Sequence, residues 1–152
     1  MKWPEFVRAQ PELASYGQRL LAESHGYVFL ATVARDGAPR VHPIAPIFSH
    51  AGLFVAIAAS SPKAADLEGD PRIALHSSVV PPSDEEFWLR GEVSRIEGES
   101  ARESAVVGQE SGAELSDAMA LWEVTLTEAG WSQWVDGRPV RLRWRSDRPG
   151  WP

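Results

Sequence analysis

The sequence contains no cysteine. This absence excludes disulfide bonds, thiolate metal ligands and cysteine nucleophiles, so the fold needs no oxidising compartment. Long apolar runs are also absent, because the densest ones, at 27–34 and 53–59, are far too short to cross a bilayer as helices. The first residues lack the apolar core of a signal peptide. We therefore expect a soluble, cytoplasmic protein that has no membrane partner.

The chain has too few basic residues for its net charge to attract a polyanion such as nucleic acid. The chain has 15 lysines and arginines against 21 aspartates and glutamates, a formal net charge of -6, which disfavours nucleic acid as a partner. Its 152 residues are the size of one domain. We expect one domain over residues 1–152, with 1–10 as an N-terminal extension and 146–152 as a C-terminal tail.

The common enzymatic motifs are missing as well. The sequence has no G-x-S-x-G turn, no Walker loop, no G-x-G-x-x-G turn and no H-E-x-x-H helix. The four histidines are dispersed and lack the spacing of metal ligands. We therefore expect no metal site, and no side chain is assigned as a catalytic acid or base.

What the sequence does contain is a sheet with short helices. Apolar residues at helical spacing predict a helix over 11–26, and a second, short helix is predicted over 62–68. One or two more short helices are expected within 100–120, where Gly108 and Gly112 interrupt a continuous one. Strands are predicted at 27–34, 39–48, 53–59, 70–78 and 86–98, the last with a bulge at Gly91, and at both sides of a turn over 135–138. This order predicts an α+β fold: a mostly antiparallel β-barrel with short flanking helices.

Two prolines mark the strand that reads RVHPIAP, residues 40–46. Pro43 and Pro46 have no N–H group, so this strand cannot be a fully paired central strand and its ladder must be interrupted. The backbone groups freed there face either solvent at a sheet edge or a flat polar ligand. On this feature alone, the edge is the favoured interpretation.

The stretch SSPKAADL, residues 60–67, places a lysine in the first turn of a helix, where the helix dipole is already positive. Ser60 or Ser61 can cap this helix, with Pro62 near its first position. The free N–H groups, the dipole and Lys63 together suit an anion. Arg40 begins the neighbouring strand, so both cations can converge on one phosphate. The alternative is that Lys63 and Arg40 are solvated surface charges.

These segments together resemble the FMN-binding split β-barrel proteins related to pyridoxamine-phosphate oxidase. The resemblance rests on RVHPI, on the stretch from LFVAIAASSPKAAD to RIALH, and on a long strand with GEVSRIEG. It covers residues 10–98 in consistent order, and 120–145 more loosely. It implies a homodimer with two FMN sites at the interface, each built from both chains. The five tryptophans at or beyond Trp122 agree with an interface.

The resemblance also implies which residues bind the cofactor. Lys63, Ser61 and Arg40 match the positions that hold the FMN phosphate, and Val41, His42 and Pro43 would lie along the isoalloxazine ring. From the second subunit, Trp134 and Arg145 match residues that touch the flavin.

Departures from the family pattern argue against vitamin B6 oxidation. Pro62 replaces a family arginine, Ala45 replaces a strand lysine, and Arg143 and Trp144 replace a histidine and an aspartate of the substrate site. The substrate helix has no counterpart in 100–115. The expected function is a flavin-dependent oxidoreductase, in which hydride passes between bound FMN and a small molecule. The alternatives are a non-catalytic flavin- or haem-binding protein, for storage or sensing, and a deazaflavin-dependent reductase.

Overall fold

The computed structural model describes residues 1–23, 27–109 and 115–147. Gly26, the last residue of the helix predicted over 11–26, and Gly112, expected to interrupt a helix, lie outside these ranges. The elements, in chain order, are α1 (Trp3–Ala9), α2 (Pro11–Glu23), β1 (Val28–Val33), β2 (Pro39–Ile44), β3 (Pro46–Phe48), β4 (Leu53–Ala58), α3 (Pro62–Gly69), β5 (Arg72–His76), β6 (Glu86–Arg95), α4 (Glu99–Val106), β7 (Met119–Val135) and β8 (Arg138–Arg145). The expected α+β composition is confirmed.

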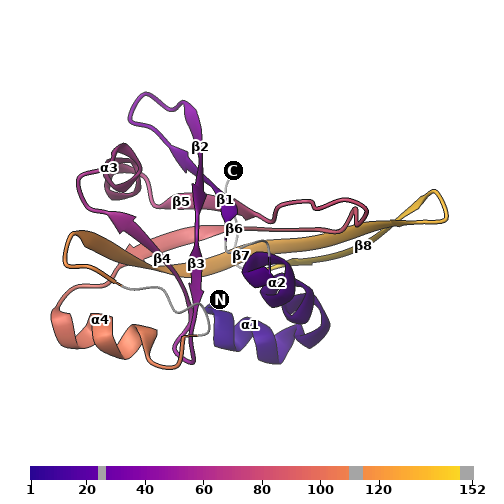
Figure 1. Cartoon of the computed structure of the whole chain (residues 1–152), viewed down its shortest axis with the longest axis horizontal. Helices are drawn as coiled ribbons and strands as arrows, with labels where there is room; N and C mark the ends of the chain where they lie inside the picture. The colour runs from indigo at the N-terminus through magenta and orange to yellow at the C-terminus, as the bar shows by residue number, and fades with distance from the viewer. Residues whose placement is uncertain (24–26, 110–114, 148–152) are drawn as a thin grey trace.

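The strands form one antiparallel sheet that curls toward a barrel. The strand order is β2-β1-β5-β6-β7-β4-β3, and β8 pairs with β7 outside this path. The two edges, β2 and β3, are consecutive in the chain and only Ala45 separates them. The hydrogen-bonded sheet is therefore open between β2 and β3, while one segment of chain forms both edges, as in a split barrel (Figure 1).

The proline-containing segment 39–48 explains this opening. The sequence predicts one interrupted strand there, and the structure contains two short ones that pair with different neighbours: β2 with β1, and β3 with β4. Pro43 lies in an edge strand, where its missing N–H costs no ladder bond to a second neighbour. Both the interruption and the edge position are confirmed.

The barrel core is filled by the alternate, inward side chains of the strands. Leu30, Leu75, Phe87 and Leu89 are fully buried and belong to one apolar cluster with the helices α1 and α2. Burying each such side chain contributes about 1.5–3 kcal/mol. The long β6–β7 ladder carries a register shift between Arg90 and Gly91, which confirms the bulge expected there.

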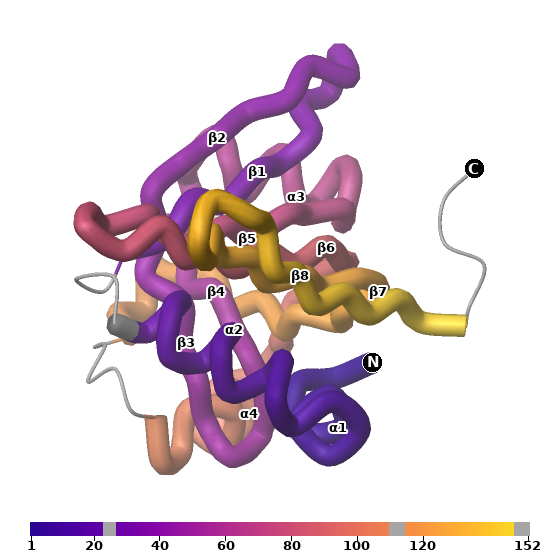
Figure 2. Tube along the Cα trace, turned by 90° about the vertical axis from the view of Figure 1, so that its right-hand side faces the viewer, coloured from indigo at the N-terminus to yellow at the C-terminus, as the bar shows by residue number. Residues whose placement is uncertain are grey.

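Helix α1 adds an element to the order predicted from the sequence. Its Trp3 and Phe6 are buried, and they make ring contacts with each other, with Phe48 of β3 and with Trp144 of β8. Helices α1 and α2 pack together beneath the β7 strand, whereas α3 lies beside the β1–β2 hairpin (Figure 2). The α1–α2 pair and helix α3 therefore occupy different sides of the barrel.

Strands β7 and β8 extend beyond the rest of the molecule as a long hairpin (Figure 1). Its turn contains Asp136 and Gly137, both with positive φ values, of 51° and 73°. Within the described ranges, no helix is long and apolar enough to cross a membrane.

Candidate functional site

The candidate site begins at the turn between β4 and α3. Ser61 is the N-cap of α3, with extended backbone angles, and its Oγ accepts a hydrogen bond from the Ala64 N–H at 3.3 Å. Pro62 is the first helical residue, as predicted. The cap uses the hydroxyl as an acceptor, so the Ser61 O–H can still donate to an anion. Lys63 follows in the first turn, at the positive end of the helix dipole.

Arg40 is held beside the same helix by a buried carboxylate. Its Nε lies 3.4 Å from Oδ2 of Asp66, whose side chain is only 6% exposed. The same Oδ2 accepts a 2.9 Å hydrogen bond from the hydroxyl of Thr32, the residue opposite Arg40 on β1. A contact through Nε leaves the two terminal nitrogens of the guanidinium free to bind an anion. Asp66 and Thr32 thus position Arg40.

The predicted site residues of β2 lie on two different faces of the sheet. Arg40 and His42 lie opposite the buried Thr32 and Leu30 of β1, on the face that carries α3. Val41 is on the other face and is 62% exposed, because side chains alternate along a strand. Pro43, also exposed, shares that face. The structure therefore places Arg40 and His42 on the face that carries α3, the helix that begins after Ser61 and contains Lys63, and directs Val41 and Pro43 to the other face.

The pKa of His42 is affected by the charges of this site. Burial lowers the pKa of its imidazole, and the positive charges of Lys63 and Arg40 lower it further, against the opposing effect of Asp66. Two cations at different places in the sequence therefore raise the electrostatic potential at one point. The buried Nε2 of His42 has no hydrogen-bond partner among the described residues. The site thus contains an imidazole with a lowered pKa and a buried, unpartnered nitrogen, near two positive charges.

Trp134 and Arg145 are far from this group in the sheet. They lie on the β7–β8 hairpin, and β7, β6, β5 and β1 separate β8 from β2. Trp134 is 57% exposed near the end of the hairpin, opposite Pro139, and Arg145 lies at the base, opposite Glu128. Within one chain, four strands thus separate these residues from β2, and whether a second chain brings them to Lys63 stays a prediction.

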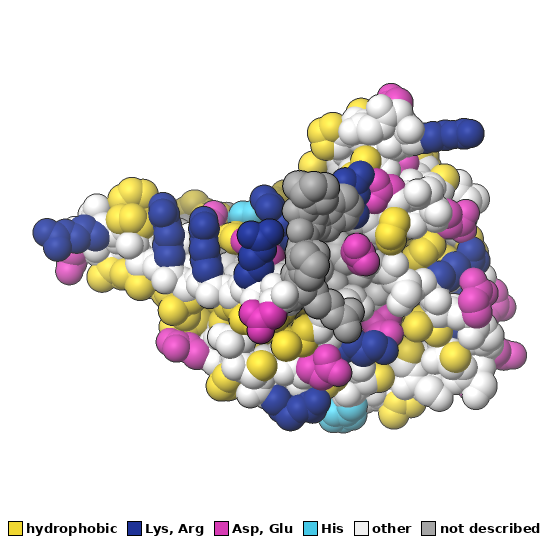
Figure 3. Space-filling view, turned by 180° about the vertical axis from the view of Figure 1, so that it is seen from behind, with side chains coloured by type: hydrophobic (Ala, Val, Ile, Leu, Met, Phe, Trp, Pro, Cys, Tyr) yellow, Lys and Arg dark blue, Asp and Glu magenta, His cyan; other side chains and the backbone are white. Residues whose placement is uncertain are grey.

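The exposed face of β8 is strongly basic. Figure 3 shows a row of basic side chains along the projecting hairpin. The arginines at alternate positions on this strand are exposed and share one face: Arg141, Arg143 and Arg145. Of the tail tryptophans expected at an interface, Trp122 and Trp131 are instead buried in the core of their own chain. Trp134 remains exposed.

Sequence reasoning missed Asp66 and Thr32. One signal was available, because Asp66 lies in the middle of a two-turn helix between Ala64 and Leu67, both of which are buried. An acid at such a position needs a partner. The cation that it binds could not be identified from the sequence, since Arg40 lies 26 residues earlier on another strand.

Comparison with known families identifies the family of this chain. The model of the pyridoxamine 5'-phosphate oxidase family matches residues 18–131, which is more than half of the chain. The chain belongs to this family. The match includes Arg40, His42, Ser61 and Lys63 but ends before Trp134 and Arg145. No curated protein matches the chain.

Solved structures with the same fold have diverse ligands in their descriptions. An FMN-binding protein from Nostoc punctiforme PCC 73102, related to pyridoxamine 5'-phosphate oxidase, has a TM-score of 0.65 at 14% identity, covering 94% of this chain and 92% of its own. A haem-binding protein from Mycobacterium smegmatis has a TM-score of 0.65 at 18% identity, covering 88% and 58%. PhzG from Burkholderia lata 383, in complex with tetrahydrophenazine-1-carboxylic acid, has a TM-score of 0.65 at 13% identity, covering 96% of this chain and 88% of its own. At these identities the comparisons establish the fold, while the ligand of this family member remains to be assigned from its own residues.

Proposed function

We propose that this protein binds FMN through its phosphate at Arg40, Ser61 and Lys63 and acts as a flavin-dependent oxidoreductase. One observation carries the proposal: Arg40 is held against α3 through Asp66, and Lys63 stands in the first turn of the same helix, directly after its Ser61 cap. The donors around this point are a guanidinium, an ammonium, a hydroxyl and helix N–H groups. These are the groups that bind a phosphate dianion.

The residues present fit such a phosphate in number and kind. Arg40 and Lys63 supply two positive charges, and the buried carboxylate of Asp66 partly offsets that of Arg40 while fixing its direction. A hydrogen bond to a charged group contributes about 1.5–3 kcal/mol. Pro62 replaces the family arginine and removes one cation, so this site depends on the two that remain.

The isoalloxazine ring is proposed to lie along β2. His42 would border it from the face that carries α3, whereas Val41 and Pro43, whose side chains lie on the other face, would border it with their backbone. We further propose a homodimer with a cofactor site at each interface, in which Trp134 and Arg145 of the partner subunit close the site. The projecting β7–β8 hairpin supports this arrangement, because Trp134 lies near its outer end.

When bound, the flavin supplies hydride transfer, and the chain positions it and sets its polarity. Arg40, Ser61 and Lys63 bind the phosphate, His42 contributes a neutral imidazole, and no side chain is required as an acid or base. The substrate would be a small molecule other than the B6 vitamer, because Ala45, Arg143 and Trp144 stand where the true oxidases have substrate-binding residues.

Haem binding is the second candidate, and His42 favours it. An imidazole with an unpaired nitrogen is a common iron ligand. The Nε2 of His42 has no partner among the described residues, and because it is buried, the side chain would have to turn to reach an iron. In this alternative the protein would store or sense its ligand without catalysis. Related haem-binding proteins with this fold support it.

The absorption spectrum of the purified protein, loaded with FMN or with haem, separates the two candidates. We expect bound FMN with a shifted flavin spectrum that bleaches when NADH or NADPH is added under anaerobic conditions. His42→Ala should leave FMN bound. The flavin proposal would be contradicted if the protein does not bind FMN but binds haem, and if the His42→Ala variant loses the haem. That result would establish the alternative.

A further inference from the structure

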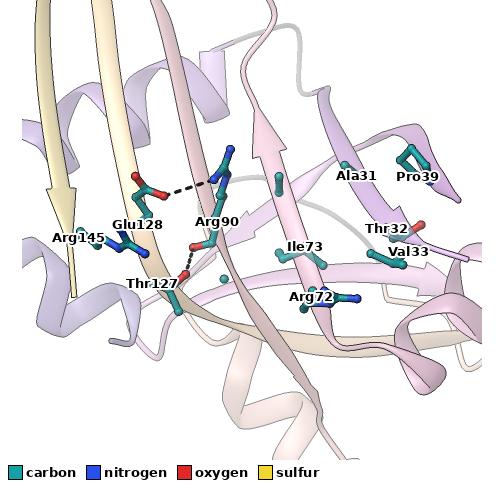
Figure 4. A pocket seen from close by; sticks show the side chains of 12 residues that line it. Ala31, Thr32, Val33, Pro39, Arg72, Ile73, Arg90, Thr127, Glu128 and Arg145 are labelled. Carbon is teal, nitrogen blue, oxygen red and sulfur yellow. Dashed lines mark hydrogen bonds and ion pairs between the residues drawn. The ribbon is translucent and has the colours of Figure 1, made fainter. Parts of the chain in front are cut away.

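The β7–β8 hairpin has two parts that are held differently. At its base, Arg90 of β6 pairs with Glu128 of β7 at 3.6 Å, and the Thr127 hydroxyl donates a 3.3 Å hydrogen bond to the Arg90 carbonyl oxygen (Figure 4). The β6–β7 ladder ends at Ser132, and among the described strands only β8 pairs with β7 beyond that residue. A two-stranded hairpin is only marginally stable by itself. Another contact must therefore fix the direction of the outer part, which carries Trp134.

One loop accompanies the outer part of the hairpin. Residues 77–85 connect β5 to β6 and extend along the hairpin (Figure 1). The loop is closed at its base, where the buried hydroxyl of Ser77 accepts a hydrogen bond from the Phe87 N–H at 2.9 Å. Farther out, Oδ1 of Asp84 accepts a hydrogen bond from the backbone N–H of Trp134 at 3.3 Å. The position of Trp134 therefore depends on where the loop places Asp84.

Glu85, the last residue of this loop, fixes it to helix α2. Its side chain is 15% exposed, and its two oxygens accept hydrogen bonds from the two terminal nitrogens of Arg19, at 2.7 and 3.2 Å. The indole N–H of Trp131 donates a further hydrogen bond to Oε1 at 3.3 Å. A bidentate pair of this kind holds both groups in one orientation. Hydrogen bonding to Arg19 also lowers the pKa of Glu85, against the opposing effect of burial, so the carboxylate is ionised at neutral pH.

Aromatic rings complete the contact between the loop, α2 and β7. Tyr16 of α2 stacks on Trp131 with ring centroids 4.1 Å apart and an interplanar angle of 16°. The Arg19 guanidinium lies 5.7 Å from the centroid of the Tyr16 ring. Two α2 residues one turn apart thus hold both Glu85 and Trp131. Trp131 is buried and stands three residues before Trp134 in the same strand. The contact therefore lies where the β6–β7 ladder ends and the outer part of the hairpin begins.

We propose that Arg19 and Glu85 are positioning residues for Trp134. They hold the loop 77–85 against β7, and through Asp84 of that loop they set where Trp134 lies. The side chain of Trp134 is 57% exposed, so packing within its own chain does little to fix it. The inference rests on the proposed function, in which Trp134 of one subunit closes the flavin site of the other. Arg19 and Glu85 would not touch the flavin, since they act through the direction of the hairpin.

Hydrogen–deuterium exchange of the full chain tests the hairpin directly. In Arg19→Gln and in Glu85→Gln, the amides of residues 133–140 should exchange at least about ten-fold faster than in the wild type, because loss of a charge-assisted pair lets the outer part open more often. Residues 119–126, which lie in the ladders with β4 and β6, should exchange as in the wild type. Arg8→Gln, at an exposed position of α1, is the control and should leave both segments unchanged.

The fluorescence of bound FMN tests whether the effect reaches the flavin through Trp134. An indole beside an isoalloxazine ring quenches its fluorescence, so Trp134→Ala should make bound FMN more fluorescent. Arg19→Gln should do the same in the wild type but add nothing in the Trp134→Ala background, because it acts through that residue. A substitution that merely weakened the fold would act additively. The preference for FMN over riboflavin should be unchanged in Arg19→Gln, since the phosphate contacts are untouched.

Three results would overturn the positioning role. The first is unchanged exchange of residues 133–140 in both variants, and the second is faster exchange spread evenly over the chain, which is an ordinary loss of stability. The third is an equal gain of flavin fluorescence from Arg19→Gln with and without Trp134. Failure of the flavin proposal looks different: neither flavin binds, or both bind equally. Faster exchange of residues 133–140 in Arg19→Gln and Glu85→Gln would still support the positioning of the hairpin in that case.

Discussion

Replacing Lys63 by alanine should weaken FMN binding by about 10-fold to 150-fold, which corresponds to about 1.5–3 kcal/mol for one charge-assisted contact. Lys63 combines a full charge with the helix start at which the N–H groups of α3 are unpaired. Arg40→Gln should have an effect of the same size, because it removes the second cation. The measurement is the quenching of FMN fluorescence during titration with protein.

Lys2, the only other lysine of the chain, provides a matched control. Its Nζ pairs with Glu123 at 2.9 Å, in the contact between the start of the chain and β7. Lys2→Ala should therefore leave FMN affinity unchanged, and Lys63→Arg should retain most of it. Unchanged affinity in Lys63→Ala would show that the phosphate lies elsewhere.

Replacing Gly91 by alanine should destabilise the fold by about 3 kcal/mol or more. A Cβ at this position would lie 2.1 Å from the carbonyl oxygen of Thr125 and 3.2 Å from Cα of Leu126. Both are backbone atoms of β7, so neither can rotate away. The longest ladder of the sheet would have to separate at its bulge. For a domain of this size, the unfolding temperature should fall by about 6–12 °C.

Gly69→Ala is the control for this substitution. Gly69 is the last residue of α3, and a Cβ there would meet nothing within 4 Å. Alanine favours a helix over glycine by about 0.5–1 kcal/mol, so this variant should be as stable as the wild type or slightly more stable. Thermal unfolding followed by circular dichroism measures both variants. Equal unfolding temperatures for Gly91→Ala and the wild type would contradict the described bulge geometry.

Much of the fold follows from local patterns in the sequence. The alternation of apolar residues, the turn residues and the cap at Ser61 are local signals, and the structure has strands and a helix where they predict them. The prolines of segment 39–48 also gave the edge position correctly. Helix α1 was missed because only two of its apolar residues are buried, Trp3 and Phe6, and their burial depends on contacts with β3 and β8.

The candidate site was harder to predict, since it depends on contacts between distant segments. The sequence gives Arg40 and Lys63 as cations, but the carboxylate that positions Arg40 lies on α3 and acts together with Thr32 of β1. The alternation of side chains along β2 was predictable, and it puts His42 on one face and Val41 and Pro43 on the other. The family resemblance instead placed all three residues beside one ring.

The central claim is that positive groups from two separate segments bind the phosphate of a flavin. Parallel titrations of the apoprotein with FMN and with riboflavin, which lacks the phosphate, test this claim most directly. Two charge-assisted contacts should make FMN bind at least about 100-fold more tightly than riboflavin. Equal affinity for the two flavins, or no binding of either, would contradict the account.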